Sequence, residues 1–188
     1  LVTHIAGRFI EVSVLPLSFA EYLELHPGDR DSRFNSYLRY GSLPEVDPDR
    51  GGAFCDAQLM GIFNTVLVED ILGRLGTGDV NTLRSIARFL YTNVGNETNT
   101  DSIARALGIG NGTVGRYMAK LEEAFLFHHS EKYDIQGKRV LKTNGKYYAS
   151  DLGLRNTALM GAGGTDISRP LENVVYLELL RRGYTVRV

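Results

Sequence analysis

Apolar residues recur along most of the chain at the three- and four-residue spacing of helices. Ser18, with Glu21 three positions later, is typical of a capping box and predicts a short helix that ends before Pro27. A second helix is expected over residues 32–40 and a long third helix over residues 53–75. Most of the first 75 residues are therefore expected to be helical. Asp70 falls on the apolar side of the third helix, where a partly exposed or locally paired carboxylate is expected.

After residue 80 the predicted helices are shorter and the connections between them are short. Apolar positions over residues 83–94 predict one helix, and Thr100 can cap a second helix over Asp101–Leu107. Gly108 occupies a position where a tight turn requires a positive φ, and another helix is expected over residues 111–124. Two short helices joined by such a turn are typical of a helix-turn-helix.

A charged β-hairpin is expected to follow these helices. Residues 125–134 predict one strand, Gly137 a loop, and the letters K-R-V-L-K a returning strand. The pair Asn144–Gly145 is typical of a second tight turn, after which K-Y-Y-A-S-D continues as a strand. The sequence thus predicts a mainly α fold with a small antiparallel β wing, a winged helix-turn-helix preceded by a helical region.

The polar face of the helix over residues 111–124 is the candidate nucleic-acid interface. Helical spacing turns its apolar residues inward and leaves four polar residues outward, where a recognition helix meets bases and phosphates: Asn111, Thr113, Arg116 and Lys120. The hairpin adds Lys138, Arg139 and Lys142 as candidate phosphate contacts. Two alternatives stay open, an exposed polar face without a partner and a strand edge that lysines protect from aggregation.

Charge distribution supports a nucleic-acid partner only weakly. The 188 residues carry a net charge of −1, but residues 81–150 contain 10 basic and 6 acidic side chains. Such a local basic excess is what phosphate binding requires. Against it, Gly112 and Gly115 each cost the helix roughly 1 kcal/mol relative to Ala. Glu122 and Glu123 also place acidic groups on its last turns.

The sequence contains no recognisable catalytic or metal-binding motif. Its single cysteine, Cys55, excludes a disulfide framework and predicts a small residue within a helix in a reducing cytoplasm. We find no phosphate-binding loop, zinc-ligand spacing or nucleophile elbow, and no apolar run long enough to span a bilayer. Catalytic residues, metal ligands, cofactors and a membrane partner are therefore not expected in this chain.

Both ends of the chain predict strands that have no partner within it. Residues 9–15 alternate as a strand, and Gly183 ends a terminal helix before a strand that begins at Tyr184. The chain is therefore expected to be the middle of a longer protein.

Six ordered stretches resemble a known prokaryotic family. They are A-G-R-F-I-E-V-S-V-L-P-L-S-F-A-E-Y-L, Y-L-R-Y-G-S-L-P-E-V, L-V-E-D-I, L-E-E-A-F-L-F, Y-Y-A-S-D-L-G-L-R-N and L-E-N-V-V-Y-L-E-L-L-R-R-G-Y. They are similar to AAA+-type ATPases that carry the domain of unknown function 4143. The resemblance implies a P-loop ATPase domain, a winged-helix domain and a C-terminal domain similar to restriction endonucleases.

The resemblance implies three parts and several roles. Residues 1–78 would be the end and helical lid of the ATPase domain, 79–150 the winged helix, and 151–188 a linker and the start of the endonuclease-like domain. ATP and Mg²⁺ would bind only in the longer protein. Arg8 matches a family Gly-Arg pair that would sense nucleotide phosphate, with a strand-edge ion pair as the alternative. Glu172 matches a carboxylate that assists metal binding in related nucleases.

Two functions follow as hypotheses. The first is a non-catalytic, DNA-binding winged helix of a cytoplasmic ATPase, with double-stranded DNA as partner. The second is a protein–protein coupling module that joins the ATPase lid to the C-terminal domain without binding DNA. The sequence leaves formation of homo-oligomers open.

Overall fold

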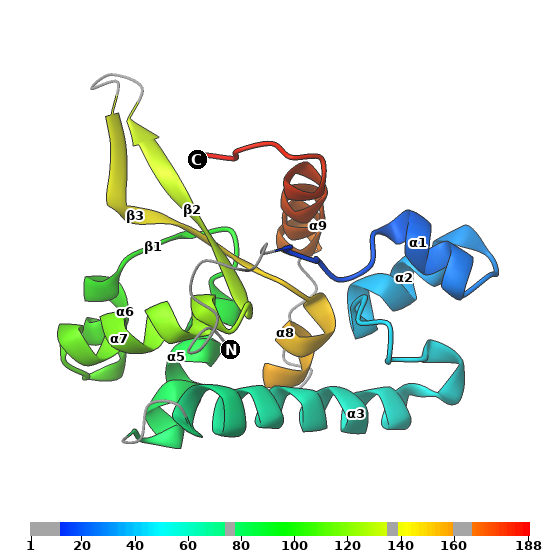
Figure 1. Cartoon of the computed structure of the whole chain (residues 1–188), viewed down its shortest axis with the longest axis horizontal. Helices are drawn as coiled ribbons and strands as arrows, with labels where there is room; N and C mark the ends of the chain where they lie inside the picture. The colour runs from blue at the N-terminus through cyan, green and yellow to red at the C-terminus, as the bar shows by residue number, and fades with distance from the viewer. Residues whose placement is uncertain (1–11, 74–77, 135–138, 160–166) are drawn as a thin grey trace.

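The computed structural model of the chain describes residues 12–73, 78–134, 139–159 and 167–188 (Figure 1). For Asp134 and residues 139–143 it describes the backbone only. The described residues are mainly helical, with a small three-stranded antiparallel sheet. The expected mainly α fold with a small antiparallel β element is therefore confirmed. None of the described helices combines the length and apolarity needed to cross a lipid bilayer.

The first two helices form an aromatic corner. They are α1 (Phe19–Leu25) and α2 (Arg30–Tyr40). The predicted capping box is present, because Ser18 Oγ accepts from the Glu21 amide while the Glu21 carboxylate accepts from the Ser18 amide. The rings of Phe19 and Tyr37 meet edge to face with centroids 5.4 Å apart. This contact holds α1 against α2.

The long predicted helix divides into α-helical and π-helical parts. The short helix η1 (Pro48–Arg50) leads into α3 (Gly52–Thr65), which continues as the π-helix η2 (Val66–Leu72). Its fully buried residues recur every fourth position, namely Cys55, Leu59, Phe63, Leu67 and Ile71. In an α-helix, residues four positions apart are offset by about 40° around the axis, so such a row drifts away from one side. A π-helix has more residues per turn, which counters this drift. Asp70 is consequently exposed and not on the apolar side.

Three helices and a short strand follow. They are α5 (Val80–Thr92), β1 (Glu97–Thr98), α6 (Thr100–Leu107) and α7 (Asn111–Glu123). The two helices predicted on either side of Gly108 are confirmed, and Gly108 is left-handed with φ 66°. The N-cap of α6 lies one residue before the predicted one. The side chain of Asn99, and not that of Thr100, accepts the hydrogen bond from the Ser102 amide.

The remaining strands are β2 (Phe127–Asp134) and β3 (Arg139–Ala149), and the sheet order is β1-β3-β2. The expected turn at Asn144–Gly145 is wrong, because β3 continues through it. The register instead jumps from Glu131 opposite Gly145 to Lys132 opposite Leu141, which makes a bulge in β3. Glycine is required there because a Cβ on Gly145 would overlap the carbonyl oxygen of Ser130.

Helices cover both faces of the sheet (Figure 1). On one face, Phe127 packs on Tyr91 of α5 with ring centroids 4.4 Å apart. On the other face lies α9 (Ser168–Arg181), whose Tyr176 stacks on Tyr148 at 3.9 Å. The buried Asn173 amide also exchanges hydrogen bonds of 2.7 and 2.8 Å with the Ala149 backbone. The sheet therefore lies between α5 and α9.

The last residue pairs with the sheet edge. The Val188 amide donates to the Glu131 carbonyl at 3.1 Å, and the Val188 carbonyl accepts from the Tyr133 amide at 2.6 Å. This is the pattern of a parallel pair along β2. The expectation that the C-terminal residues have no strand to pair with is wrong.

The short helix α8 (Leu152–Ala158) joins the first three helices to the rest. Asp151 caps it and also accepts from the Ser42 amide at 2.7 Å. Arg155 donates from Nε to the carbonyl of Tyr91 at 3.1 Å, at the end of α5. Asn156 donates to the carbonyl of Arg39 at 2.8 Å, at the end of α2. The predicted boundaries at residues 78 and 150 stay predictions.

Burial raises the pKa of the Asp151 carboxyl, and the backbone amides of Ser42, Leu154 and Gly153 act in the opposite direction. The side chain is 2% exposed, so its oxygens depend on these donors. The carboxylate is also closely surrounded, because a Cβ on Gly41 would overlap its oxygens.

Replacing Gly41 by alanine tests this packing. Gly41 has φ 76° and ψ −159°, and a Cβ there would overlap the Asp151 carboxylate. Gly51 has the similar φ 91° and ψ 155° but open space around a Cβ, so Gly51→Ala is a matched control. The backbone strain costs about 1–3 kcal/mol in both variants. We expect Gly41→Ala to lower the free energy of unfolding by about 2 kcal/mol more, because of the overlap. Equal losses in urea denaturation would contradict this.

Phe125, the residue after the C-cap of α7, provides a second test. It has φ 55° and is 61% exposed, and the hydrogen bonds from Leu126 to Leu121 and from Phe125 to Glu122 form a Schellman motif. Glycine is favoured at this left-handed position. We expect Phe125→Gly to raise the free energy of unfolding by about 1 kcal/mol in urea denaturation. A decrease would show that contacts of the Phe125 ring outweigh its backbone strain.

Candidate nucleic-acid interface

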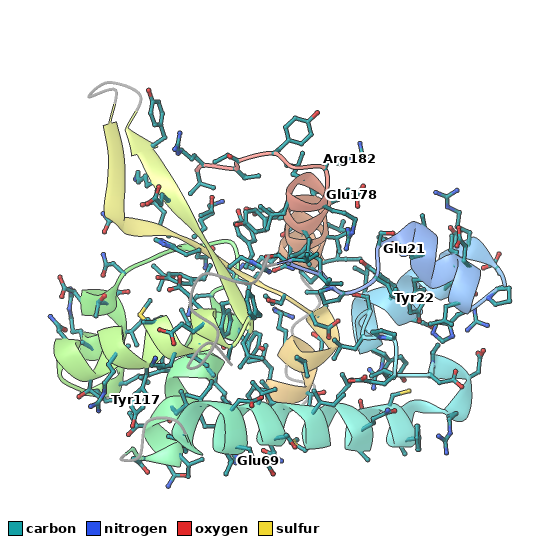
Figure 2. All side chains as sticks on the ribbon, viewed as in Figure 1. Glu21, Tyr22, Glu69, Tyr117, Glu178 and Arg182 are labelled. Carbon is teal, nitrogen blue, oxygen red and sulfur yellow. The ribbon has the colours of Figure 1, made fainter. Side chains whose placement is uncertain are left out.

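The site is built on α7, whose inner face is fixed by the core. Val114, Tyr117 and Leu121 are buried, at most 2% exposed. The Tyr117 hydroxyl also accepts from the Asp79 amide at 2.8 Å and so ties α7 to the start of α5. Tyr117 is labelled in Figure 2. The orientation of the outer face of α7 is therefore set by these contacts.

The four predicted residues of α7 do not share one face. At about 100° per residue, Thr113, Arg116 and Lys120 fall within an arc of about 60°. Asn111 lies about 140° away from Arg116 around the helix axis. The structure therefore brings together three of the four, and Asn111 lies on the side of α7 that faces α6.

Asn111 has a partner within the chain. Its Nδ2 donates to Asp101 Oδ1 at 2.6 Å, which ties the first turn of α7 to the first turn of α6. The predicted reading of adenine by Asn111 would require this hydrogen bond to break. A role in joining the two helices is the observed one.

Arg116 is the most accessible cation of the site. Its side chain is exposed, with the guanidinium carbon 5.5 Å from the ring centroid of Tyr117. No described carboxylate forms an ion pair with it. Lys120 is half-buried and forms an ion pair with Glu123 one turn later. Only part of the predicted positive charge is thus available to a phosphate.

The two acidic residues at the end of α7 differ in their surroundings. Glu122 is half-buried next to Tyr147 of the sheet, and burial raises the pKa of its carboxyl. Glu123 is exposed and pairs with Lys120. Helical spacing distinguishes the two positions, because Glu122 lies close to Asn111 around the axis and away from Arg116.

Described cations of the hairpin are also paired. Lys132 contacts Glu97 at 2.7 Å, and Lys146 contacts Glu172 at 2.8 Å. The Tyr148 hydroxyl donates to Glu172 as well, at 2.7 Å, so Glu172 joins α9 to the sheet. These side chains contribute to packing of the sheet more than to a free basic surface.

Several predicted residues lie outside the described part of the chain. Arg8 and Lys138 are not described, and Arg139 and Lys142 are described by their backbone in β3 alone. Their predicted contacts with nucleotide or nucleic acid stay predictions.

The first turn of α7 presents bare backbone. A Cβ on Gly110 or Gly112 would meet no atom within 4 Å, and the cap residue Gly110 offers no side-chain hydrogen bond. Another helix, strand or nucleic-acid backbone can therefore approach this turn closely. The described residues that can hold a metal ion lie elsewhere, at His26, Asp47 and Asp49.

Comparison with known proteins corrects the sequence-based family assignment. A protein-family model described as a domain of unknown function, DUF8612, matches residues 31–165. The assignment to AAA+-type ATPases with the domain of unknown function 4143 is therefore wrong, and with it the description of the chain as a middle piece of such an ATPase. The expected ATP and Mg²⁺ rested on that assignment alone.

Two curated proteins that resemble the chain carry the name uncharacterized protein. One, from Haemophilus influenzae, is 39% identical over 202 residues and aligns with 100% of this chain and 49% of its own length. Another, from Methanocaldococcus jannaschii, is 24% identical over 205 residues, which cover 98% of this chain and 44% of the relative. The chain thus spans about half the length of these relatives. No solved structure matches it. The match over residues 31–165 shows that the chain belongs to the DUF8612 family.

Proposed function

We propose that residues 80–149 form a winged-helix unit that binds double-stranded DNA through α7. The order of elements supports this proposal: helix, short strand, two helices, then a two-stranded hairpin whose partner strand is β1. In such a unit the second helix of the turn enters the major groove and the hairpin lies beside it.

The free outer face of α7 is the observation that carries the proposal. The core residues of α7 all turn inward, while Gly112, Arg116 and Ala119 are exposed. The major groove is about 12 Å wide and admits a helix. A helix with small residues beside one arginine can approach a groove without steric hindrance.

The charges predict weak, largely sequence-independent binding. Each phosphate contact adds about 0.9 to the slope of log affinity against log salt. Arg116 and Lys120 provide at most two such contacts from the described part of α7. Lys138, Arg139 and Lys142 of the hairpin add up to three if their predicted contacts are made. The salt slope is therefore expected to be about 1.8 if only α7 contributes and up to about 4.5 if the hairpin contacts are made.

Protein–protein coupling is the second candidate. The ion pairs Lys120–Glu123, Lys132–Glu97 and Lys146–Glu172 favour it, because they neutralise cations that phosphate binding would use. In this case the partner of α7 is protein, and the described chain binds no duplex at low salt. Titration of labelled duplex DNA at low ionic strength decides between the two candidates.

Replacing Arg116 by alanine tests the DNA-binding face. We expect Arg116→Ala to weaken duplex binding and to reduce the salt slope by about 1, because one phosphate contact is lost. Arg39→Ala is the matched control, since Arg39 is a 62% exposed arginine on α2, on the opposite side of the molecule (Figure 1). Fluorescence anisotropy of labelled duplex at several salt concentrations measures both. Equal losses in the two variants would refute a specific role for α7.

Removing the acidic partner of Lys120 provides a test in the opposite direction. Glu123→Gln leaves Lys120 without its ion pair, so we expect tighter duplex binding and a salt slope larger by up to about 1. Glu24→Gln on α1 removes the same charge from an exposed position far from α7 and serves as the control. Unchanged affinity in Glu123→Gln would place Lys120 outside the interface.

A further inference from the structure

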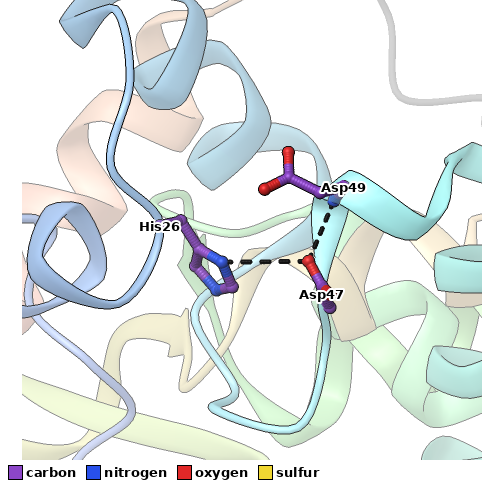
Figure 3. Close-up of side chains that lie close together, drawn as sticks. All are labelled: His26, Asp47 and Asp49. Atoms are coloured by element: carbon purple, nitrogen blue, oxygen red, sulfur yellow. Dashed lines mark hydrogen bonds and ion pairs between the residues drawn. The ribbon is translucent and has the colours of Figure 1, made fainter.

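The end of α1 places a histidine against two aspartates. His26 is the C-cap residue of α1 and is 7% exposed. Its Nδ1 points at Asp47 Oδ1 across 3.9 Å, which is longer than a hydrogen bond (Figure 3). Its Nε2 is buried without a hydrogen-bond partner among the described residues. Among the described residues, the ring therefore has one long ion-pair contact, with Asp47, and a buried Nε2 without a hydrogen bond.

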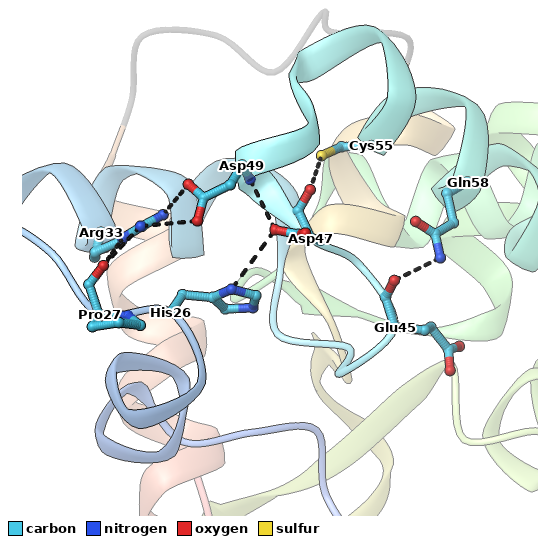
Figure 4. A network of polar contacts seen from close by, with 8 residues as sticks. All are labelled: His26, Pro27, Arg33, Glu45, Asp47, Asp49, Cys55 and Gln58. Carbon is cyan, nitrogen blue, oxygen red and sulfur yellow. Dashed lines mark hydrogen bonds and ion pairs between the residues drawn. The ribbon is translucent and has the colours of Figure 1, made fainter.

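Both carboxylates are held in position by other groups. Asp47 caps η1 by accepting from the Asp49 amide at 3.0 Å, and its carbonyl accepts from Cys55 Sγ at 3.2 Å (Figure 4). Asp49 accepts two hydrogen bonds from Arg33, at 2.7 and 3.0 Å. Each carboxylate keeps lone pairs for a further bond, because a carboxylate offers about four acceptor sites.

A second buried polar group beside the histidine lacks a partner. Tyr22 is 1% exposed, and its hydroxyl has no hydrogen-bond partner among the described residues. The Tyr22 ring packs against the His26 ring with centroids 4.8 Å apart. Buried polar side chains are normally satisfied, so these two neighbouring groups are candidates for a bond to an ion, a water molecule or another bound group.

We propose that His26, Asp47 and Asp49 bind one zinc ion. Their candidate ligand atoms, a ring nitrogen and one oxygen of each carboxylate, all lie within 4.8 Å of one another. Zinc bonds of 2.0–2.1 Å place neighbouring tetrahedral ligands about 3.4 Å apart. The ligand atoms therefore need to approach one another by about 0.5 Å for His26 and Asp47 and by up to about 1.4 Å for the widest pair. A fourth position is open to water.

The ligand set selects the class of ion. Mg²⁺ and Ca²⁺ take oxygen ligands almost entirely, whereas an imidazole nitrogen favours zinc and its first-row neighbours. Asp49 already shares its charge with Arg33, so Asp47 is the carboxylate with the larger unbalanced charge. One histidine with two carboxylates thus points to Zn²⁺ above the alkaline-earth ions.

Zinc at this position would act as a structural clip. It would join the end of α1 to η1, and so close the segment from residue 26 to residue 47. Because the ligands come together only in the folded chain, zinc would stabilise that state by mass action. This role is independent of DNA binding by α7.

Metal titration tests the proposal. The variants are His26→Asn and Asp47→Asn; the second keeps an oxygen that can cap η1. Asp79→Asn is the control, because Asp79 caps α5 in the same way at an exposed position. We expect one zinc ion to bind the wild type and Asp79→Asn by calorimetry and to raise Tm in both. We expect binding to be at least about tenfold weaker in the two site variants.

X-ray absorption at the zinc edge of the wild type identifies the ligands even if a variant fails to fold. We expect one imidazole nitrogen and several oxygen ligands at 2.0–2.1 Å from the zinc, and no sulfur ligand. Sulfur ligation, two or more imidazoles, or no zinc binding by the folded wild type would each overturn the proposal. Unchanged zinc affinity in both site variants would overturn it as well.

Discussion

The buried carboxylate of Asp151 is the interaction on which the assembly of the helices depends. Taking a carboxylate out of water costs several kcal/mol unless donors surround it. Here the donors are the Ser42 and Leu154 amides, which belong to segments more than one hundred residues apart. The chain therefore satisfies this charge only when α2 and α8 are both in place. Gly41, which leaves room for the carboxylate, is part of the same arrangement.

A second constraint acts on the sheet. Its hairpin is covered by α9 on one face and by α5 on the other, and its outer edge pairs with Val188. The side-chain amide of Asn173 satisfies the backbone N–H and C=O of Ala149, as a neighbouring strand would. The sheet is thus integrated in the body of the protein near β3, whereas the outer face of α7 is exposed in the part of the chain that the structure describes. This asymmetry is why we place the proposed partner at α7.

Local chemistry made the helices predictable. Ser18 and Glu21 form their capping box, and Gly108 adopts its left-handed turn, because short-range sterics and hydrogen bonds decide both. Local rules misled at Asn144–Gly145. This pair favours a hairpin turn, but Gly145 serves a close approach of strands within a bulge. The hydrogen bonds between β2 and β3 along the whole of β2 outweighed the preference of Asn144–Gly145 for a turn.

The candidate sites show the same division. Helical spacing correctly placed Arg116 on the surface. It did not show that Asn111 hydrogen-bonds to Asp101 or that Lys120 pairs with Glu123, and both contacts occupy groups that were expected to bind nucleic acid. Metal ligands were not expected, because His26, Asp47 and Asp49 match no zinc-ligand spacing along the chain. Short motifs also suggested a family that the longer match corrects.

The positions of most helices, the left-handed turn at Gly108 and the inner face of α7 were determined by the sequence alone, since each depends on residues within about four positions of one another. Tertiary structure alone decided that Asp151 is buried, that Glu172 joins α9 to the sheet, and that His26 meets Asp47. These outcomes join groups separated by 20 to more than 100 positions. Only burial and packing of the folded chain determine which of its many polar groups become neighbours.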